Sequence, residues 1–135
     1  MKLVVFLFVC TVVSSEIDVW SNIFRENFSQ MDKNSDGLVE MSEYSQMFLA
    51  ADVNGDGGVT LNEYLKTEAL VENHATLTED FHFNDHNKDG VVNMVDIRLQ
   101  FNQIDTNNDD KIEQNEFVVY AENLVKTKGH PAFGK

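Results

Sequence analysis

The chain has 135 residues, and 23 acidic against 10 basic side chains give it a formal net charge of −13 at neutral pH. A surface this acidic repels phosphate groups, which argues against nucleic acids and anionic membranes as partners. The length suits a single small domain, whose core is only marginally stable by itself.

Residues 1–15 have the features of a secretory signal peptide. Lys2 precedes an apolar run that ends at Val13, and two serines follow the run. The run is shorter than the ~20 residues needed to span a bilayer. We therefore expect cleavage after Ser15 and a secreted, extracellular mature chain; a buried N-terminal helix or a membrane anchor is the alternative. The only cysteine, Cys10, lies in this segment, so the mature chain would contain no disulfide.

Apolar residues at helical spacing predict six helices in the rest of the chain. They cover residues 16–31, 41–51, 61–73, 77–84, 94–104 and 114–126, with a break at 74–75. Turn-forming residues between 128 and 135 predict a flexible tail. We therefore expect one all-α domain over residues 16–127.

Four twelve-residue segments between these helices repeat one pattern of oxygen-bearing side chains. We call them loops 1 to 4; they span residues 32–43, 52–63, 85–96 and 105–116. Positions 1, 3, 5, 9 and 12 of each loop carry a side-chain oxygen, and position 6 is glycine in the first three. The candidate metal ligands at positions 1, 3, 5 and 12 are Asp32, Asn34, Asp36 and Glu43; Asp52, Asn54, Asp56 and Glu63; Asp85, Asn87, Asp89 and Asp96; and Asp105, Asn107, Asp109 and Glu116.

This pattern suits calcium, a hard cation that takes about six to eight oxygens at roughly 2.3–2.6 Å. A chain that wraps around the ion presents an oxygen at nearly every second residue. It then reverses direction, which requires the positive φ that glycine tolerates. A glutamate at position 12 is long enough to return from the next helix and bind with both oxygens.

The flanks of the loops repeat as well. A phenylalanine stands four residues before each loop and a large apolar residue directly after it, at inward positions of an entering and an exiting helix. The residues before the loops are Phe28, Phe48, Phe81 and Phe101, and those after them are Tyr44, Tyr64, Ile97 and Phe117. Loops and flanks together make residues 20–124 resemble the EF-hand superfamily. The resemblance implies calcium as the bound ion and a compact, all-α array of four EF-hand loops with short helices.

Two loops depart from the EF-hand pattern. Loop 3 ends in Asp96, which is one methylene shorter than glutamate, so we expect a lower coordination number and a relative preference for Mg²⁺ there. Loop 4 has Asp110 at the glycine position, and a left-handed backbone costs this residue roughly 1–2 kcal/mol. We therefore expect loops 1 and 2 to bind calcium more tightly than loops 3 and 4.

The spacing of the loops predicts how they pair. Only eight residues separate loop 1 from loop 2, and eight separate loop 3 from loop 4. Each interval has room for one helix, which must leave one loop and enter the next. Because the two ends of such a helix are ~15 Å apart, we expect loop 2 to pair with loop 3 through Val59 and Val92. Loop 1 could pair with loop 4 through Val39 and Ile112, or with another copy of the chain.

The sequence contains no nucleophile–base constellation or phosphate-binding loop, so we expect no enzymatic activity. Small acidic EF-hand proteins with a signal peptide resemble those of invertebrate extracellular and shell matrices. That resemblance implies an extracellular calcium buffer or carrier, or a biomineral matrix component whose partners are calcium mineral or matrix proteins. The alternative is a calcium-triggered interaction protein that exposes an apolar groove to a target helix. Against it, extracellular calcium is high and steady.

Overall fold

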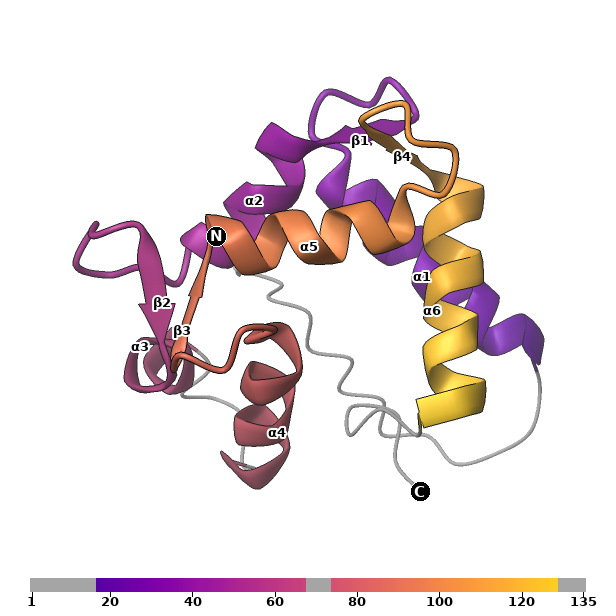
Figure 1. Cartoon of the computed structure of the whole chain (residues 1–135). Coiled ribbons are helices and arrows are strands. Elements are labelled where there is room, and N and C mark those ends of the chain that lie inside the picture. Colours follow the sequence, from indigo (N-terminus) through magenta and orange to yellow (C-terminus); the bar gives the residue numbers. More distant parts are fainter. Residues whose placement is uncertain (1–16, 68–73, 129–135) are drawn as a thin grey trace.

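The computed structural model describes residues 17–67 and 74–128, in which each loop contains a short strand that leads directly into a helix (Figure 1). In chain order the elements are α1 (Ile17–Met31), β1 (Leu38–Glu40), α2 (Met41–Leu49), β2 (Gly58–Thr60), α3 (Leu61–Thr67), α4 (His74–Asn84), β3 (Val91–Asn93), α5 (Met94–Ile104), β4 (Lys111–Glu113) and α6 (Gln114–Lys128). The predicted signal peptide, the predicted tail from 129 onward and the predicted helical residues 68–73 lie outside the described residues.

One helix lies in each short interval between loops. α2 is the single helix between loops 1 and 2, and α5 is the single helix between loops 3 and 4. This arrangement agrees with the sharing of helices that the spacing predicts. α2 ends two residues earlier than predicted, because the chain tightens there into a 3₁₀ turn. In that turn the N–H groups of Ala51 and Asp52 donate to the carbonyls three residues before them, at 3.0 and 3.1 Å.

The predicted break at residues 74–75 is wrong, because α4 begins at His74. Ala75 has the highest helix propensity of all residues, and neither position is a glycine or a proline that would stop a helix. α6 continues to Lys128, two residues beyond its predicted end. Residues 114–128 contain no glycine or proline, and the first glycine after them is Gly129.

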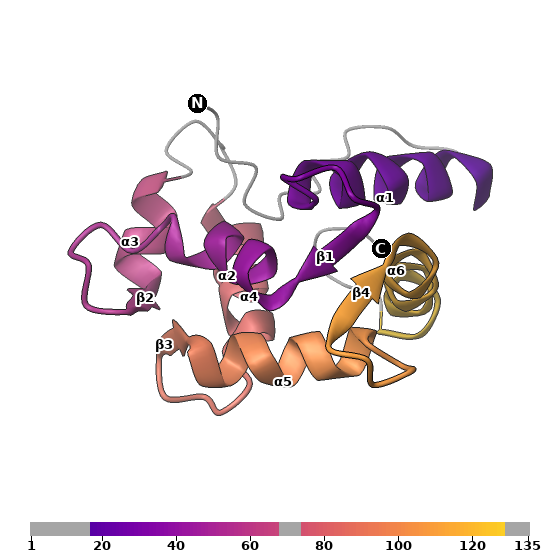
Figure 2. The same cartoon turned by 90° about the horizontal axis from the view of Figure 1, so that it is seen from above.

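The four strands form two antiparallel ladders between loops that are distant in sequence. β2 pairs with β3, with Val59 opposite Val92, and β1 pairs with β4, with Val39 opposite Ile112. Both predicted pairings are therefore confirmed, and the second one forms within a single chain. α2 and α5 pack against each other and run from one ladder to the other (Figure 2).

The core lies between the central helices α2 and α5 and the outer helices that pack on both sides of them. α1 packs against α6 beside the 1–4 ladder, and α3 packs against α4 beside the 2–3 ladder. All eight apolar residues that flank the loops are buried, as the helical spacing predicts. Tyr44 contacts Phe48 and Phe101 with ring centroids 5.5 and 5.6 Å apart, which joins the two central helices.

A buried polar network crosses the half of the molecule that contains loops 2 and 3. The hydroxyl of Tyr64 on α3 donates to the carboxyl group of Asp80 on α4. One turn later, Asn84 Nδ2 donates to the carbonyl of Asp80 at 2.9 Å, and Gln100 Nε2 on α5 donates to Asn84 Oδ1 at 3.2 Å. The exposed fractions of these four side chains lie between 4 and 7%. The network therefore bonds three helices together in the interior.

Burial raises the pKa of Asp80 from 3.8 to about 6, although the hydrogen bond from Tyr64 opposes the shift. A carboxyl group whose pKa is raised by folding stabilises the fold when protonated. Its contribution is complete below pH ~3.8 and is lost as the pH rises through about 6. The shift of about two pKa units corresponds to roughly 3 kcal/mol.

We expect the Asp80→Asn substitution to remove this pH dependence, because asparagine stays neutral and still offers Tyr64 an acceptor oxygen. The free energy of unfolding of the variant, relative to the parent, should rise by roughly 2 kcal/mol between pH 4 and pH 7, because at pH 4 part of the full effect is already lost. Urea unfolding of both proteins at the two pH values measures this difference. All other residues are identical in the two proteins, so their contribution to the pH dependence cancels in the comparison. Equal pH dependence in the two proteins would contradict the assignment.

Candidate metal centres

The aspartate at position 1 is held by the backbone of its own loop in all four cases. One carboxylate oxygen accepts the N–H of position 5, and the other accepts the N–H of position 6. The distances are 3.1 and 2.8 Å at Asp32, 3.3 and 2.8 Å at Asp52, 3.1 and 2.9 Å at Asp85, and 3.2 and 3.0 Å at Asp105. The loop therefore curls around this carboxylate.

The side chains at positions 3 and 5 also accept backbone hydrogen bonds in every loop. The amide oxygen at position 3 accepts the N–H of position 5 at 2.8–2.9 Å. A carboxylate oxygen at position 5 accepts the N–H of position 7 at 2.9–3.0 Å. Each such oxygen has a second lone pair. The residues predicted as ligands therefore keep the capacity to bind a hard cation while the backbone orients them.

The residue at position 12 returns to the start of its loop, as the EF-hand pattern requires. In loop 1, Glu43 Oε1 accepts the N–H groups of Lys33 and Asn34 at 2.9 and 3.2 Å, and Oε2 accepts the N–H of Glu40 at 3.1 Å. Glu116 in loop 4 repeats these three contacts at 3.0–3.1 Å.

In loops 2 and 3 the residue at position 12 also bonds to the start of its loop, but its partners differ slightly from those in loops 1 and 4. Glu63 accepts the side-chain amide of Asn54 at 2.8 Å and the N–H of Thr60 at 3.0 Å. Asp96 accepts backbone N–H groups at positions 3 and 9, both at 3.1 Å. The shorter side chain of Asp96 thus spans its loop with both oxygens, and it is only 1% exposed.

Hydrogen bonds keep two of these carboxyl groups acidic. The backbone N–H and the hydroxyl of Thr60 hold the pKa of Glu63 below its ordinary value. Burial raises the pKa of Glu116, but hydrogen bonds from the backbone of Glu113 and from Thr106 outweigh it and lower the pKa overall. The hydroxyl of Thr60 stands at position 9 of loop 2 and belongs to the predicted pattern, whereas the hydroxyl of Thr106, at position 2 of loop 4, is a site contact that the pattern does not contain. Nothing in the sequence marks Thr106, which stands ten residues before Glu116.

The loop backbones are left-handed at two positions. At position 6 the φ angles are 84°, 89° and 87° at the glycines and 63° at Asp110, which confirms the expected conformation of this aspartate. Position 4 is left-handed as well, at Ser35, Gly55, Lys88 and Asn108, which the loop pattern does not predict. Glycine and asparagine there were a usable signal, whereas lysine has no preference for this region.

We expect the Asp110→Gly substitution to stabilise the protein by ~1 kcal/mol and to tighten metal binding at loop 4, because glycine adopts φ near 63° without strain. Thermal unfolding and calcium titration measure the two effects. Gly37→Ala is the matched control, because it introduces a Cβ at the same position of loop 1, where φ is 84°. It should destabilise the protein. A loss of stability with Asp110→Gly would show that the aspartate side chain outweighs its backbone strain.

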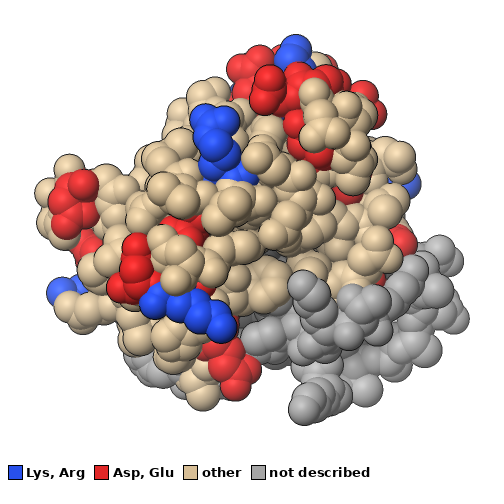
Figure 3. Space-filling model, viewed as in Figure 1, with Lys and Arg blue, Asp and Glu red and all other residues tan. Residues whose placement is uncertain are grey.

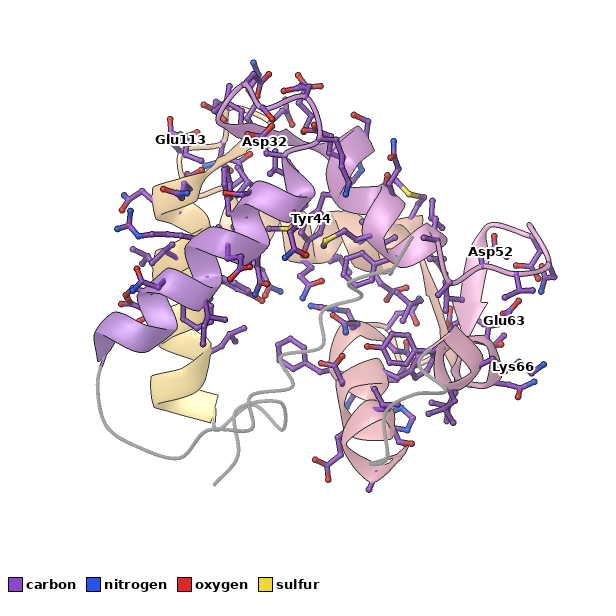
Figure 4. All side chains as sticks on the ribbon, turned by 180° about the vertical axis from the view of Figure 1, so that it is seen from behind. Asp32, Tyr44, Asp52, Glu63, Lys66 and Glu113 are labelled. Carbon is purple, nitrogen blue, oxygen red and sulfur yellow. The ribbon has the colours of Figure 1, made fainter. Side chains whose placement is uncertain are left out.

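Acidic side chains gather over loops 1 and 4 at the top of the molecule and over loop 2 at its left edge (Figure 3). Asp52 and Glu63 lie on one side of the molecule, and Asp32 and Glu113 lie on the other (Figure 4). Within residues 17–67 and 74–128, no three His, Cys, Asp or Glu side chains are close enough to hold an ion as they stand. An EF-hand site takes its other oxygens from asparagine and backbone carbonyl groups. The side chains of each loop therefore fit a calcium ion in kind and order, and they must draw inward to bind it.

Comparison with known protein families matches three of the four loops to one family model. A family model described as "EF hand" matches residues 24–49, 45–66 and 97–119, which contain loops 1, 2 and 4. Each of these three stretches is an EF hand. These EF hands support the binding of calcium, and EF-hand proteins are generally not catalytic. No curated protein and no solved structure matches the chain significantly.

Loop 3 lies outside the three EF-hand matches. Its backbone hydrogen bonds nevertheless follow the same scheme as those of the matched loops. Among the described residues, no helix is both long and apolar enough to cross a bilayer.

Proposed function

We propose that all four loops of this protein bind calcium, through the side chains at positions 1, 3, 5 and 12. The observation that supports this proposal is the repetition of one hydrogen-bond scheme in four loops, including the loop that the family model does not match. In each loop the backbone orients side-chain oxygens that still have lone pairs for a cation. The protein would act without catalysis.

The proposed sites differ in strength. Loops 1 and 2 have glutamate at position 12 and glycine at position 6, so we propose that they bind calcium most tightly. The backbone strain at Asp110 weakens loop 4. The side chain of Asp96 is one methylene shorter than that of glutamate, so it would supply fewer oxygens to an ion in loop 3. The lower coordination number favours Mg²⁺ relative to calcium there.

We propose an extracellular buffer, carrier or matrix component as the biological role. Positions 1, 3, 5, 9 and 12 of the four loops carry fourteen carboxylates, which repel one another without metal. Four calcium ions would compensate eight of those charges, so binding would also stabilise the fold. The signal-like residues 1–15 support secretion, and the acidity is compatible with a calcium mineral or matrix partner.

Calorimetric titration of the chain with calcium should give four bound ions. Glu43→Gln and Glu63→Gln should each remove a tight site, because the amide loses the charge and one of the two anionic ligand oxygens. Asp96→Asn should remove a weak site, which magnesium competes for most effectively. Binding of one ion or none would overturn the proposal. If all three substitutions reduced calcium binding equally, the proposed order of affinities would be overturned.

The rival function, exposure of an apolar groove to a target helix, has little support in this structure. The hollow among the core side chains of the 2–3 half, lined by Phe48, Val59, Tyr64, Phe81, Asn84 and Val92, has a volume of about 10 Å³. That is room for about one water molecule. A partner side chain could enter only after the helices separate.

A hydrophobic dye distinguishes the two functions. If calcium stabilises the closed core, dye fluorescence should fall as calcium is added, because the repelling carboxylates are neutralised and the helices pack more tightly. A calcium-triggered switch would raise the fluorescence instead. Magnesium at the same ionic strength is the control for charge screening.

A further inference from the structure

The hydrogen bond between Tyr64 and Asp80 lies directly behind the paired loops 2 and 3. Tyr64 follows Glu63, the last residue of loop 2, in the first turn of α3. Asp80 lies on α4, five residues before Asp85, the first residue of loop 3. Both side chains are only 4% exposed. The bond therefore ties the helix that leaves loop 2 to the helix that enters loop 3.

The same network reaches both ends of loop 3. Asn84, which directly precedes Asp85, donates to the carbonyl of Asp80 and accepts from Gln100. Gln100 lies on α5, one turn after Asp96 at the end of loop 3. The network thus includes Tyr64, directly after loop 2, and Asn84, directly before loop 3. It also includes Gln100, one turn into the helix that leaves loop 3.

The half with loops 1 and 4 differs at the corresponding tyrosine. Tyr44 follows Glu43 as Tyr64 follows Glu63, and it is completely buried. Its hydroxyl has no hydrogen-bond partner among the described residues. Burial, and then the proximity of Tyr120, raise its pKa well above the ordinary value. Tyr44 and Tyr64 are therefore a matched pair in which only the second hydroxyl has a bonding role at its loop.

The outer helices of the 1–4 half are joined farther from the loops. Ser21 Oγ on α1 donates to Glu122 Oε1 on α6 at 2.7 Å. Ser21 lies eleven residues before loop 1 and Glu122 six residues after loop 4. This bond holds the two helices together but does not adjoin a proposed ligand.

We propose that Tyr64 and Asp80 are positioning residues for the metal sites of loops 2 and 3. The inference rests on the proposed binding of calcium by these loops. The bond fixes the start of α3, and with it Glu63, relative to the helix that leads into Asp85. Ligands that are held before binding lose less conformational entropy when the ion arrives. The bond therefore raises the affinity of loops 2 and 3 and leaves loops 1 and 4 unaffected.

The test is a calcium titration of the full chain, followed separately at each loop by NMR. The amides of Gly37, Gly57, Gly90 and Asp110 are suitable reporters, because each donates to the position-1 aspartate of its own loop at 2.8–3.0 Å. Tyr64→Phe removes only the hydroxyl group. It should weaken calcium binding roughly three- to tenfold at the Gly57 and Gly90 reporters, as expected for the loss of one hydrogen bond. The other two reporters should keep their midpoints.

Two further variants separate positioning from general stability. Tyr44→Phe removes the unpartnered hydroxyl at the equivalent place and should leave all four midpoints unchanged. Asp80→Asn keeps an acceptor oxygen for Tyr64 and should retain the parent affinities, whereas Asp80→Ala should reproduce the selective loss. The alanine variant also provides a second measurement if Tyr64→Phe does not fold.

Equal weakening at all four reporters, or no weakening at loops 2 and 3, would overturn the positioning role while calcium binding itself remains. If no reporter of the parent protein responds to calcium, the proposed function fails and the inference fails with it. A selective loss at loops 2 and 3 that Asp80→Asn does not show would establish the positioning role.

Discussion

The eight residues between neighbouring loops determine the arrangement of the whole molecule. An EF-hand loop needs a helix at each end, yet each short interval holds only α2 or α5. A helix rises about 1.5 Å per residue, so a nine- to eleven-residue helix keeps its two loops ~15 Å apart. Loops on one helix therefore cannot share a ladder. Each pairs instead with a loop on the other central helix, in the 1–4 and 2–3 ladders, and α2 and α5 pack against each other between the ladders.

This arrangement joins each loop to two others in different ways. α2 connects loops 1 and 2, the β2–β3 ladder connects loops 2 and 3, α5 connects loops 3 and 4, and the β1–β4 ladder connects loops 4 and 1. The connections close into a cycle with no terminal member. Packing between Tyr44 and Phe101 adds a contact across the middle of the cycle. Any energetic coupling along these connections would be reciprocal by thermodynamic necessity.

The sequence predicted the features that depend on spacing and periodicity. Glycine and oxygen positions predicted the loops, and helical spacing predicted buried flanks such as Phe28 and Phe117. The short intervals predicted the 2–3 ladder and left the 1–4 ladder as one of two alternatives. Features that depend on tertiary contacts were missed. The left-handed backbone at Lys88 is imposed by the loop against the preference of lysine. The bond from Tyr64 to Asp80 joins residues sixteen positions apart on different helices, and neither periodicity nor a motif marks it.

Loop 3 shows how a site can depart from its family pattern and keep its geometry. Aspartate at position 12 shortens the side chain that must return to the start of the loop. In the structure Asp96 still accepts the N–H groups of Asn87 and Asn93 at 3.1 Å each, and it is more deeply buried than the glutamates at the same position. Directly behind this loop, Asn84 and Gln100 hold α4 and α5 to each other. The half of the molecule with the shorter closing ligand is thus also the half in which buried hydrogen bonds fix the helices.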